Sequence, residues 1–109
     1  MTVAALAAQL NLREITVADP DREVTGAYAG DLLSWVMGRV NEGDAWVTIM
    51  TNINVIAVAS LADVACVILS EDVGVDADVV AAAKAKGITL LGSAASTYAV
   101  CKALGEVLA

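Results

Sequence analysis

The chain has 109 residues, 59% of them apolar, and its 13 acidic and 6 basic side chains give a net charge of −7. This length predicts one domain, residues 1–109, with ample material for a core. No apolar run is long enough to cross a bilayer, and residues 2–10 lack the basic flank of a signal peptide. The acidic balance offers no basic patch for nucleic acid or anionic membranes. We therefore expect a cytoplasmic protein that binds neither.

The first 30 residues predict one helix and two short strands. Residues 3–10 are rich in Ala, Leu and Gln, which favours a helix, and Thr2 is its expected N-cap. Residues 13–18 alternate between polar and apolar, as a half-buried or edge strand does. Residues 24–28 form a second short strand after a turn that contains Pro20.

From residue 45 to residue 97 the chain repeats a unit made of an apolar run, a polar turn and a helical segment. The expected strands are 45–50, 64–69 and 88–91, and the expected helices are 55–62, 79–86 and a last one that begins after Ser93. Such alternation is typical of βαβ units and of a parallel sheet covered on both faces. The sequence therefore predicts an α/β fold, a three-layer α/β/α domain with a mainly parallel sheet of four to five strands, with 13–18 beside the others.

Two helices in the middle of the chain carry more apolar residues than one sheet face requires. Asp31 is expected to cap a helix over 32–40 with one apolar face, and in helix 55–62 only Ser60 is polar. A helix that is apolar all round is covered on nearly all sides, either within the monomer or by a second subunit. We favour the second explanation and expect a homodimer whose interface includes Trp35, Val55, Ile56, Val58 and Leu61.

Small polar side chains follow the predicted parallel strands. Because the carboxyl ends of parallel strands meet at one edge of a sheet, these side chains are expected to converge. The helix starts behind Thr51 and Ser93 offer free N–H groups suited to an anion. The residues expected to form this ligand-binding rim are Thr51, Asn52, Asn54, Ser70, Ser93, Ser96 and Thr97. The alternative is that these side chains only cap helices.

The sequence lacks the residue types that usually carry catalysis. It contains no histidine, so no serine has the usual general base, and no Gly-rich phosphate loop with a lysine is present. Cys66 and Cys101 lie among apolar neighbours and are expected to be core thiols. Glu71 and Asp72 could hold a divalent cation with Asp76, but turn acids are usually solvated. We expect no enzymatic activity, no catalytic residue, no cofactor and no bound metal.

Several short patterns in the second half carry a family resemblance. Residues 67–70, 76–85, 86–91 and 95–98 resemble the DRTGG domain, and the shorter patterns at 31–34 and 54–59 fit it too. The resemblance extends over about residues 13–106. Similar domains occur between CBS domains in some inorganic pyrophosphatases and before the catalytic part of some long phosphotransacetylases. Small stand-alone versions are often encoded near iron hydrogenase genes.

This sequence departs from the family pattern in one loop. The family is named for a Gly-Asp-Arg-type loop after a strand, whereas residues 50–54 read Met-Thr-Asn-Ile-Asn, without the Asp and the Arg. Three hypotheses for the function follow. The favoured one is a non-catalytic, homodimeric regulatory or interaction module that senses a small anionic or nucleotide-like ligand. The alternatives are a scaffold with a partner in a redox complex of the iron hydrogenase type, and an enzyme acting on a phosphorylated small molecule.

Overall fold

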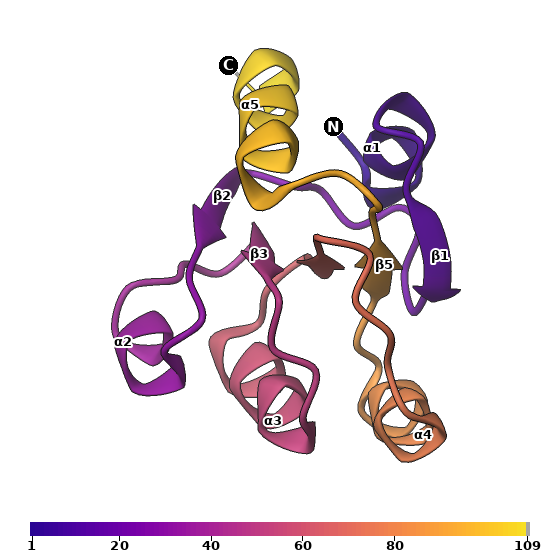
Figure 1. Cartoon of the computed structure of the whole chain (residues 1–109), viewed down its shortest axis with the longest axis vertical. Coiled ribbons are helices and arrows are strands. Elements are labelled where there is room, and N and C mark those ends of the chain that lie inside the picture. Colours follow the sequence, from indigo (N-terminus) through magenta and orange to yellow (C-terminus); the bar gives the residue numbers. More distant parts are fainter. Residues whose placement is uncertain (109) are drawn as a thin grey trace.

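A single sheet of five strands separates two layers of helices in this computed structural model, which describes residues 1–108 (Figure 1). The strand order across the sheet is β1-β5-β4-β3-β2. The strands are β1 (Arg13–Thr16), β2 (Gly26–Ala29), β3 (Asp44–Thr48), β4 (Cys66–Leu69) and β5 (Leu90–Gly92). The helices are α1 (Val3–Gln9), α2 (Leu33–Met37), α3 (Ile53–Ala62), α4 (Ala77–Lys86) and α5 (Thr97–Leu108).

The sheet is mixed but mainly parallel. Strands β2, β3, β4 and β5 run parallel to one another, and β1 lies antiparallel to β5 at one edge. Helices α1 and α5 cover one face, and α2, α3 and α4 cover the other (Figure 1). The predicted three-layer α/β/α architecture is confirmed. Among the described residues no helix has both the length and the apolar character needed to cross a membrane.

The central strands are buried on both faces. Every residue of β3 and β4 is buried, and their side chains alternate between the two cores. Val47 and Ile68 pack in the core under α1 and α5, whereas Trp46 and Val67 pack in the core over α2, α3 and α4. This alternation explains why the sequence shows continuous apolar runs here, since a strand covered on both sides needs apolar residues at every position.

Strand β1 is held to the sheet by a buried hydroxyl group. The predicted strand 13–18 is shorter in the structure, and its pairing with β5 is irregular between Glu14 and Thr16. Thr16 Oγ1 donates to the Ile88 carbonyl at 2.8 Å and accepts from the Leu90 N–H at 3.0 Å. These two bonds join the end of β1 to β5 and to the residues just before it.

Helix caps agree with the sequence in some places and not in others. Thr2 caps α1 by accepting from the Ala5 N–H at 3.1 Å, and Gly87 ends α4 in the left-handed region at φ 68°. The prediction that Asp31 caps a helix over 32–40 is wrong, because α2 covers only Leu33–Met37 and has no side-chain cap. Asp31 Oδ1 instead accepts from Thr48 Oγ1 at 2.8 Å and from the Ile49 N–H at 3.0 Å, which ties this loop to the end of β3.

Helix α3 has one covered face and one exposed face. Val55 and Ile56 are only 2% and 1% exposed, and both pack in the core of the same chain. These two side chains are therefore core residues and are not available to a second subunit, contrary to the sequence-based expectation. Ile53 and Leu61 on the outer face are 52% and 75% exposed. The outer face also carries Asn54 and Ser60, and the monomer covers only the side that meets the sheet.

Candidate functional site

The loops after β4 and β5 are joined by short hydrogen bonds at the carboxyl edge of the sheet. Ser70 is fully buried at the end of β4, and its Oγ lies 2.7 Å from Thr97 Oγ1 at the start of α5. The Ser93 N–H donates to the Leu69 carbonyl at 2.8 Å, and the Asp72 N–H donates to the Ser93 carbonyl at 2.9 Å. The structure thus brings Ser70, Ser93 and Thr97 into one cluster, as parallel strand ends predict.

The polar residues after β3 form a separate group. Asn52 is the N-cap of α3, and its Oδ1 accepts from the Asn54 N–H at 2.9 Å. Thr51 is partly buried, whereas Asn52 and Asn54 are exposed. Within residues 1–108 no side-chain hydrogen bond joins this group to the Ser70–Ser93–Thr97 cluster. The predicted rim is therefore two groups of polar side chains at the same edge.

Glu71, considered from the sequence only as a possible cation ligand, pairs at this edge with the start of α5. Its Oε2 accepts from the Thr97 N–H at 2.9 Å, so a carboxylate of the chain itself occupies the positive end of α5. The same helix starts later than predicted, at Thr97, and Ser96 Oγ accepts from the Ala99 N–H at 3.1 Å. Glu71 and Thr97 lie 26 residues apart, so no local pattern could have paired them. Ser93 Oγ accepts from the Ala95 N–H at 3.1 Å.

The neighbouring charges at this edge are also paired. Asp72 forms an ion pair with Arg13 of β1, with Nη1 and Oδ1 3.6 Å apart, and both side chains are more than half exposed. The Arg13 guanidinium lies against Gly92, where an added Cβ would stand 2.7 Å from Nη2. Glu71 and Asp72 both have positive φ, 62° and 55°, which turns the chain sharply between β4 and the loop that leads to α4.

The hydroxyl groups of this edge bond to each other. Among the described residues the side-chain partner of Ser70 Oγ is the Thr97 hydroxyl, which is no base at neutral pH. Among the described residues no three His, Cys, Asp or Glu side chains lie close enough together to hold a metal ion. This arrangement can hold a ligand through hydroxyl and amide groups.

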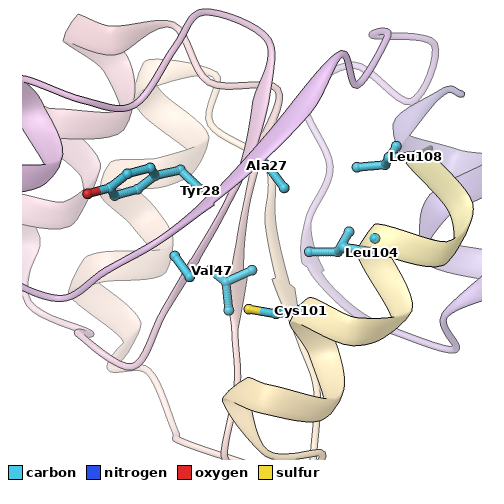
Figure 2. Close-up of a pocket in the computed structure, with 8 residues that line it drawn as sticks. Ala27, Tyr28, Val47, Cys101, Leu104 and Leu108 are labelled. Carbon is cyan, nitrogen blue, oxygen red and sulfur yellow. The ribbon is translucent and has the colours of Figure 1, made fainter.

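The cysteines lie away from this edge. Cys66 is buried in β4, and burial raises the pKa of its thiol to about 12. Cys101 is only partly buried, which also raises its pKa, and it lines an apolar groove of about 350 Å³ between β2 and α5 (Figure 2). Figure 2 shows Cys101 and Leu104 of α5 across from Ala27 and Val47. Among residues 1–108 no charged side chain lines this groove.

A second apolar surface lies on the opposite side of the sheet, where α2 and α3 are neighbours (Figure 1). We call it the α2–α3 face, and it comprises Leu33, Ser34, Met37, Asn54, Ala57, Val58 and Leu61. A groove of about 400 Å³ runs along it, with Ala57 and Val58 on one side and Leu33 and Met37 on the other. The Arg39 guanidinium lies 3.4 Å from the centre of the half-exposed Trp35 ring. Of the interface residues predicted from sequence, Val58 and Leu61 belong to this face, and Trp35 lines a separate groove with Asp31 and Leu32.

Together the mixed sheet, its two helical layers and the polar carboxyl edge define a three-layer α/β/α domain. The sequence matches no protein-family model and no curated protein. A crystal structure does match: the CBS and DRTGG domains of the regulatory region of Clostridium perfringens pyrophosphatase, complexed with its activator diadenosine tetraphosphate. The TM-score is 0.71 at 11% sequence identity, over 94% of this chain.

The likeness is one of fold, since the identity is low. This chain spans 45% of the matched chain, a little under half of its length. The chain therefore has a DRTGG-like α/β/α fold. The resemblance seen in the short sequence patterns is confirmed as a resemblance of fold.

Proposed function

We propose that this chain is a non-catalytic regulatory module that senses a small nucleotide-like anion and acts as a homodimer. The fold supports this proposal, because a regulatory region that contains a DRTGG domain shares it and is described as bound to diadenosine tetraphosphate. The observation that carries the proposal is the pairing of the polar groups at the carboxyl edge. Ser70 Oγ bonds to the Thr97 hydroxyl, and the Thr97 N–H donates to the Glu71 carboxylate.

The position of Glu71 limits where an anion would bind. Its carboxylate already accepts from the first N–H of α5, so a phosphate group there would have to displace it. The start of α3 carries no such carboxylate, and only the Asn52 amide oxygen caps it. We therefore expect the ligand to contact Thr51, Asn52 and Asn54, with the hydroxyl groups of the β4 and β5 loops beside it.

Binding of diadenosine tetraphosphate, measured by isothermal titration calorimetry, tests this function. The informative variant is Asn52→Asp, because Asp caps a helix as well as Asn does and adds a negative charge at the expected phosphate position. We expect saturable binding to the wild-type chain and about tenfold or weaker binding to Asn52→Asp, a loss of about 1.4 kcal/mol.

A matched control separates local from general electrostatics. Ala85→Glu adds the same charge to an exposed position near the end of α4, away from the carboxyl edge, and should bind as the wild type does. Absence of heat with the wild type would reject the nucleotide ligand. Turnover of the nucleotide, followed by chromatography of the same samples, would reject the non-catalytic role.

A further inference from the structure

We infer that the free edge of β2 pairs with the same edge of a second copy, so that two sheets join into one across a twofold axis. This inference rests on the proposed homodimer and names the surface that forms it. Among residues 1–108, β2 is the last strand of the sheet and pairs only with β3. The free edge of such a strand presents backbone N–H and C=O groups that another strand can satisfy.

The backbone groups on this free edge belong to Ala27 and Ala29. The Gly30 N–H donates to the Val47 carbonyl at 3.1 Å, so Gly30 turns its N–H toward β3. Because these groups alternate along a strand, those of Tyr28 also face β3, and those of Ala27 and Ala29 face away from it. Both alanines are exposed. The edge therefore offers the backbone of two residues to an added strand.

The two edges of the sheet differ in how they are protected against pairing. Charged side chains, proline and irregular pairing are among the features that prevent a strand from adding to an edge. Strand β1 has Arg13 and Glu14, and its pairing with β5 is irregular. Strand β2 reads Gly-Ala-Tyr-Ala and pairs with β3 in continuous register. The structure therefore protects β1 and leaves β2 open to another strand.

Room for an added strand lies on both faces of β2. The groove of about 350 Å³ lies on the α5 side, where Ala27 points toward Leu104 and Leu108 (Figure 2). A second groove, of about 410 Å³, lies on the α2 side and is lined by Tyr28, Ala29, Gly30, Asp31, Leu32, Trp35 and Val36. The side chains of a strand alternate between two faces, so an added strand reaches both grooves. A helix laid against β2 would reach only one of them.

The sequence around the edge is self-complementary, which favours a second copy as the added strand. A twofold axis makes the pairing antiparallel, and pairing Ala27 with Ala29 of the partner subunit places the outward backbone groups opposite one another. In this register Tyr28 meets Tyr28 of the partner subunit, and cross-strand aromatic pairs stabilise a sheet. Neither Glu23 nor Asp31 then stands opposite a carboxylate, which matters because each copy has a net charge of −7.

Hydrogen exchange of the wild type, followed by NMR over a concentration series, tests the inference without a substitution. We expect the Ala27 and Ala29 amides to exchange about tenfold or more slowly at concentrations where sedimentation velocity shows a dimer than in the dilute monomer. These amides face away from β3, so pairing at the free edge is what protects them. A dimer in which both amides exchange as fast as in the monomer would overturn the assignment of the edge.

The variant Ala29→Pro tests the same edge by removing an outward N–H. Proline is tolerated where the N–H of an edge strand faces solvent, so the pairing of β2 with β3 should survive. We expect the dissociation constant, measured by sedimentation velocity, to rise about tenfold or more. The matched control Ala29→Ser changes the same side chain, keeps the N–H and should sediment as the wild type does. Circular dichroism checks the fold of both variants, and hydrogen exchange of the wild type decides the question if Ala29→Pro unfolds.

Two further outcomes would contradict the inference. A wild-type dimer that Ala29→Pro leaves intact, or that Ala29→Ser weakens equally, would overturn the assignment of the edge. A monomeric wild type at high micromolar concentration would exclude a second copy as the added strand. Neither result would change the calorimetric test of ligand binding, so failure of this inference and failure of the proposed ligand can be distinguished.

Discussion

Glu71 shows how one side chain can change the chemistry of a sheet edge. In a parallel α/β fold, the start of the helix after a strand is a ready anion site. Here the Glu71 carboxylate accepts from the Thr97 N–H at 2.9 Å, so the chain supplies the anion itself. The contact also links the loop after β4 to the start of α5. Glu71 therefore stabilises the edge and keeps external anions away from this helix.

Replacing Glu71 should destabilise the fold, and the loss should depend on whether the new side chain can still accept a hydrogen bond from the Thr97 N–H. We expect Glu71→Ala to lower the free energy of unfolding by about 0.5–2 kcal/mol, the usual effect of losing a helix cap. Glu71→Gln keeps an oxygen acceptor and should lose less. Urea denaturation followed by circular dichroism measures both. The control is Glu106→Ala, which removes an exposed carboxylate from α5, the helix whose start Glu71 caps. Equal stabilities for Glu71→Ala and the wild type would contradict the cap.

Cys66 makes the stability of the chain depend on pH in the alkaline range. Burial raises the pKa of its thiol from 9.0 to about 12, so the folded chain keeps this proton where the unfolded chain releases it. The contribution is therefore fully present below pH 9 and is lost as the pH rises toward 12.

The variant Cys66→Ala isolates this effect. It should be less stable than the wild type near neutral pH, because it leaves a small cavity in β4. Its free energy of unfolding should fall less steeply above pH 9, because the variant has no buried thiol that releases its proton when the chain unfolds. Urea titrations at a series of pH values from neutral to alkaline give both slopes. Parallel slopes would show that Cys66 does not contribute to the pH dependence.

At the scale of elements, α3 is mostly apolar on every side, yet one of its faces is buried and the other is exposed to solvent. Val55, Ile56 and Ala59 pack against the sheet, while Ile53 and Leu61 face outward. A helix of this composition gives no periodic signal, because every side contains similar residues. Only its position over β3 and β4 decides which residues become core.

The two faces should respond differently to truncation. We expect Ile56→Ala to lower the free energy of unfolding by about 2–5 kcal/mol, as truncation of a buried residue does. Ile53→Ala, the same change on the outer face, should alter it by less than about 1 kcal/mol. Chemical denaturation compares the pair directly. Similar losses at both positions would mean that the outer face is covered within the monomer.

At the scale of the whole molecule, an acidic chain carries an uncharged apolar face. In the proposed homodimer the net charge of −7 would oppose association, and the burial of exposed apolar side chains would favour it. Salt changes the balance between these two terms, because it shortens the Debye length from about 10 Å at 0.1 M to about 3 Å at 1 M. Association of two copies should therefore respond to salt in one direction.

We expect the dimer to become tighter as the sodium chloride concentration rises. Screening weakens the repulsion between two acidic copies and leaves the apolar contact in place. Sedimentation velocity at low and high salt measures the dissociation constant, and Ala29→Pro should associate more weakly than the wild type at both. Weaker association at high salt would indicate that ion pairs hold the copies together through a different surface.

The sequence by itself determined the features that depend on neighbours along the chain. Continuous apolar runs predicted β3 and β4, because strands covered on both faces need apolar side chains at each position. Thr2, Asn52 and Gly87 were readable as helix ends, since a cap bonds to groups two or three residues away or adopts a particular φ. The polar residues after the strands could be assigned to one edge, because the carboxyl ends of parallel strands meet there.

The tertiary structure alone decided the features that depend on which elements become neighbours. Asp31 has the sequence context of a cap, but the nearby end of β3 offers it the Thr48 hydroxyl and the Ile49 N–H. Glu71 reaches Thr97 only because β4 and β5 are adjacent in the sheet. The division of α3 into core and surface has the same origin. Burial and long-range hydrogen bonds are set by packing, and packing brings together residues whose separation along the chain carries no local signal.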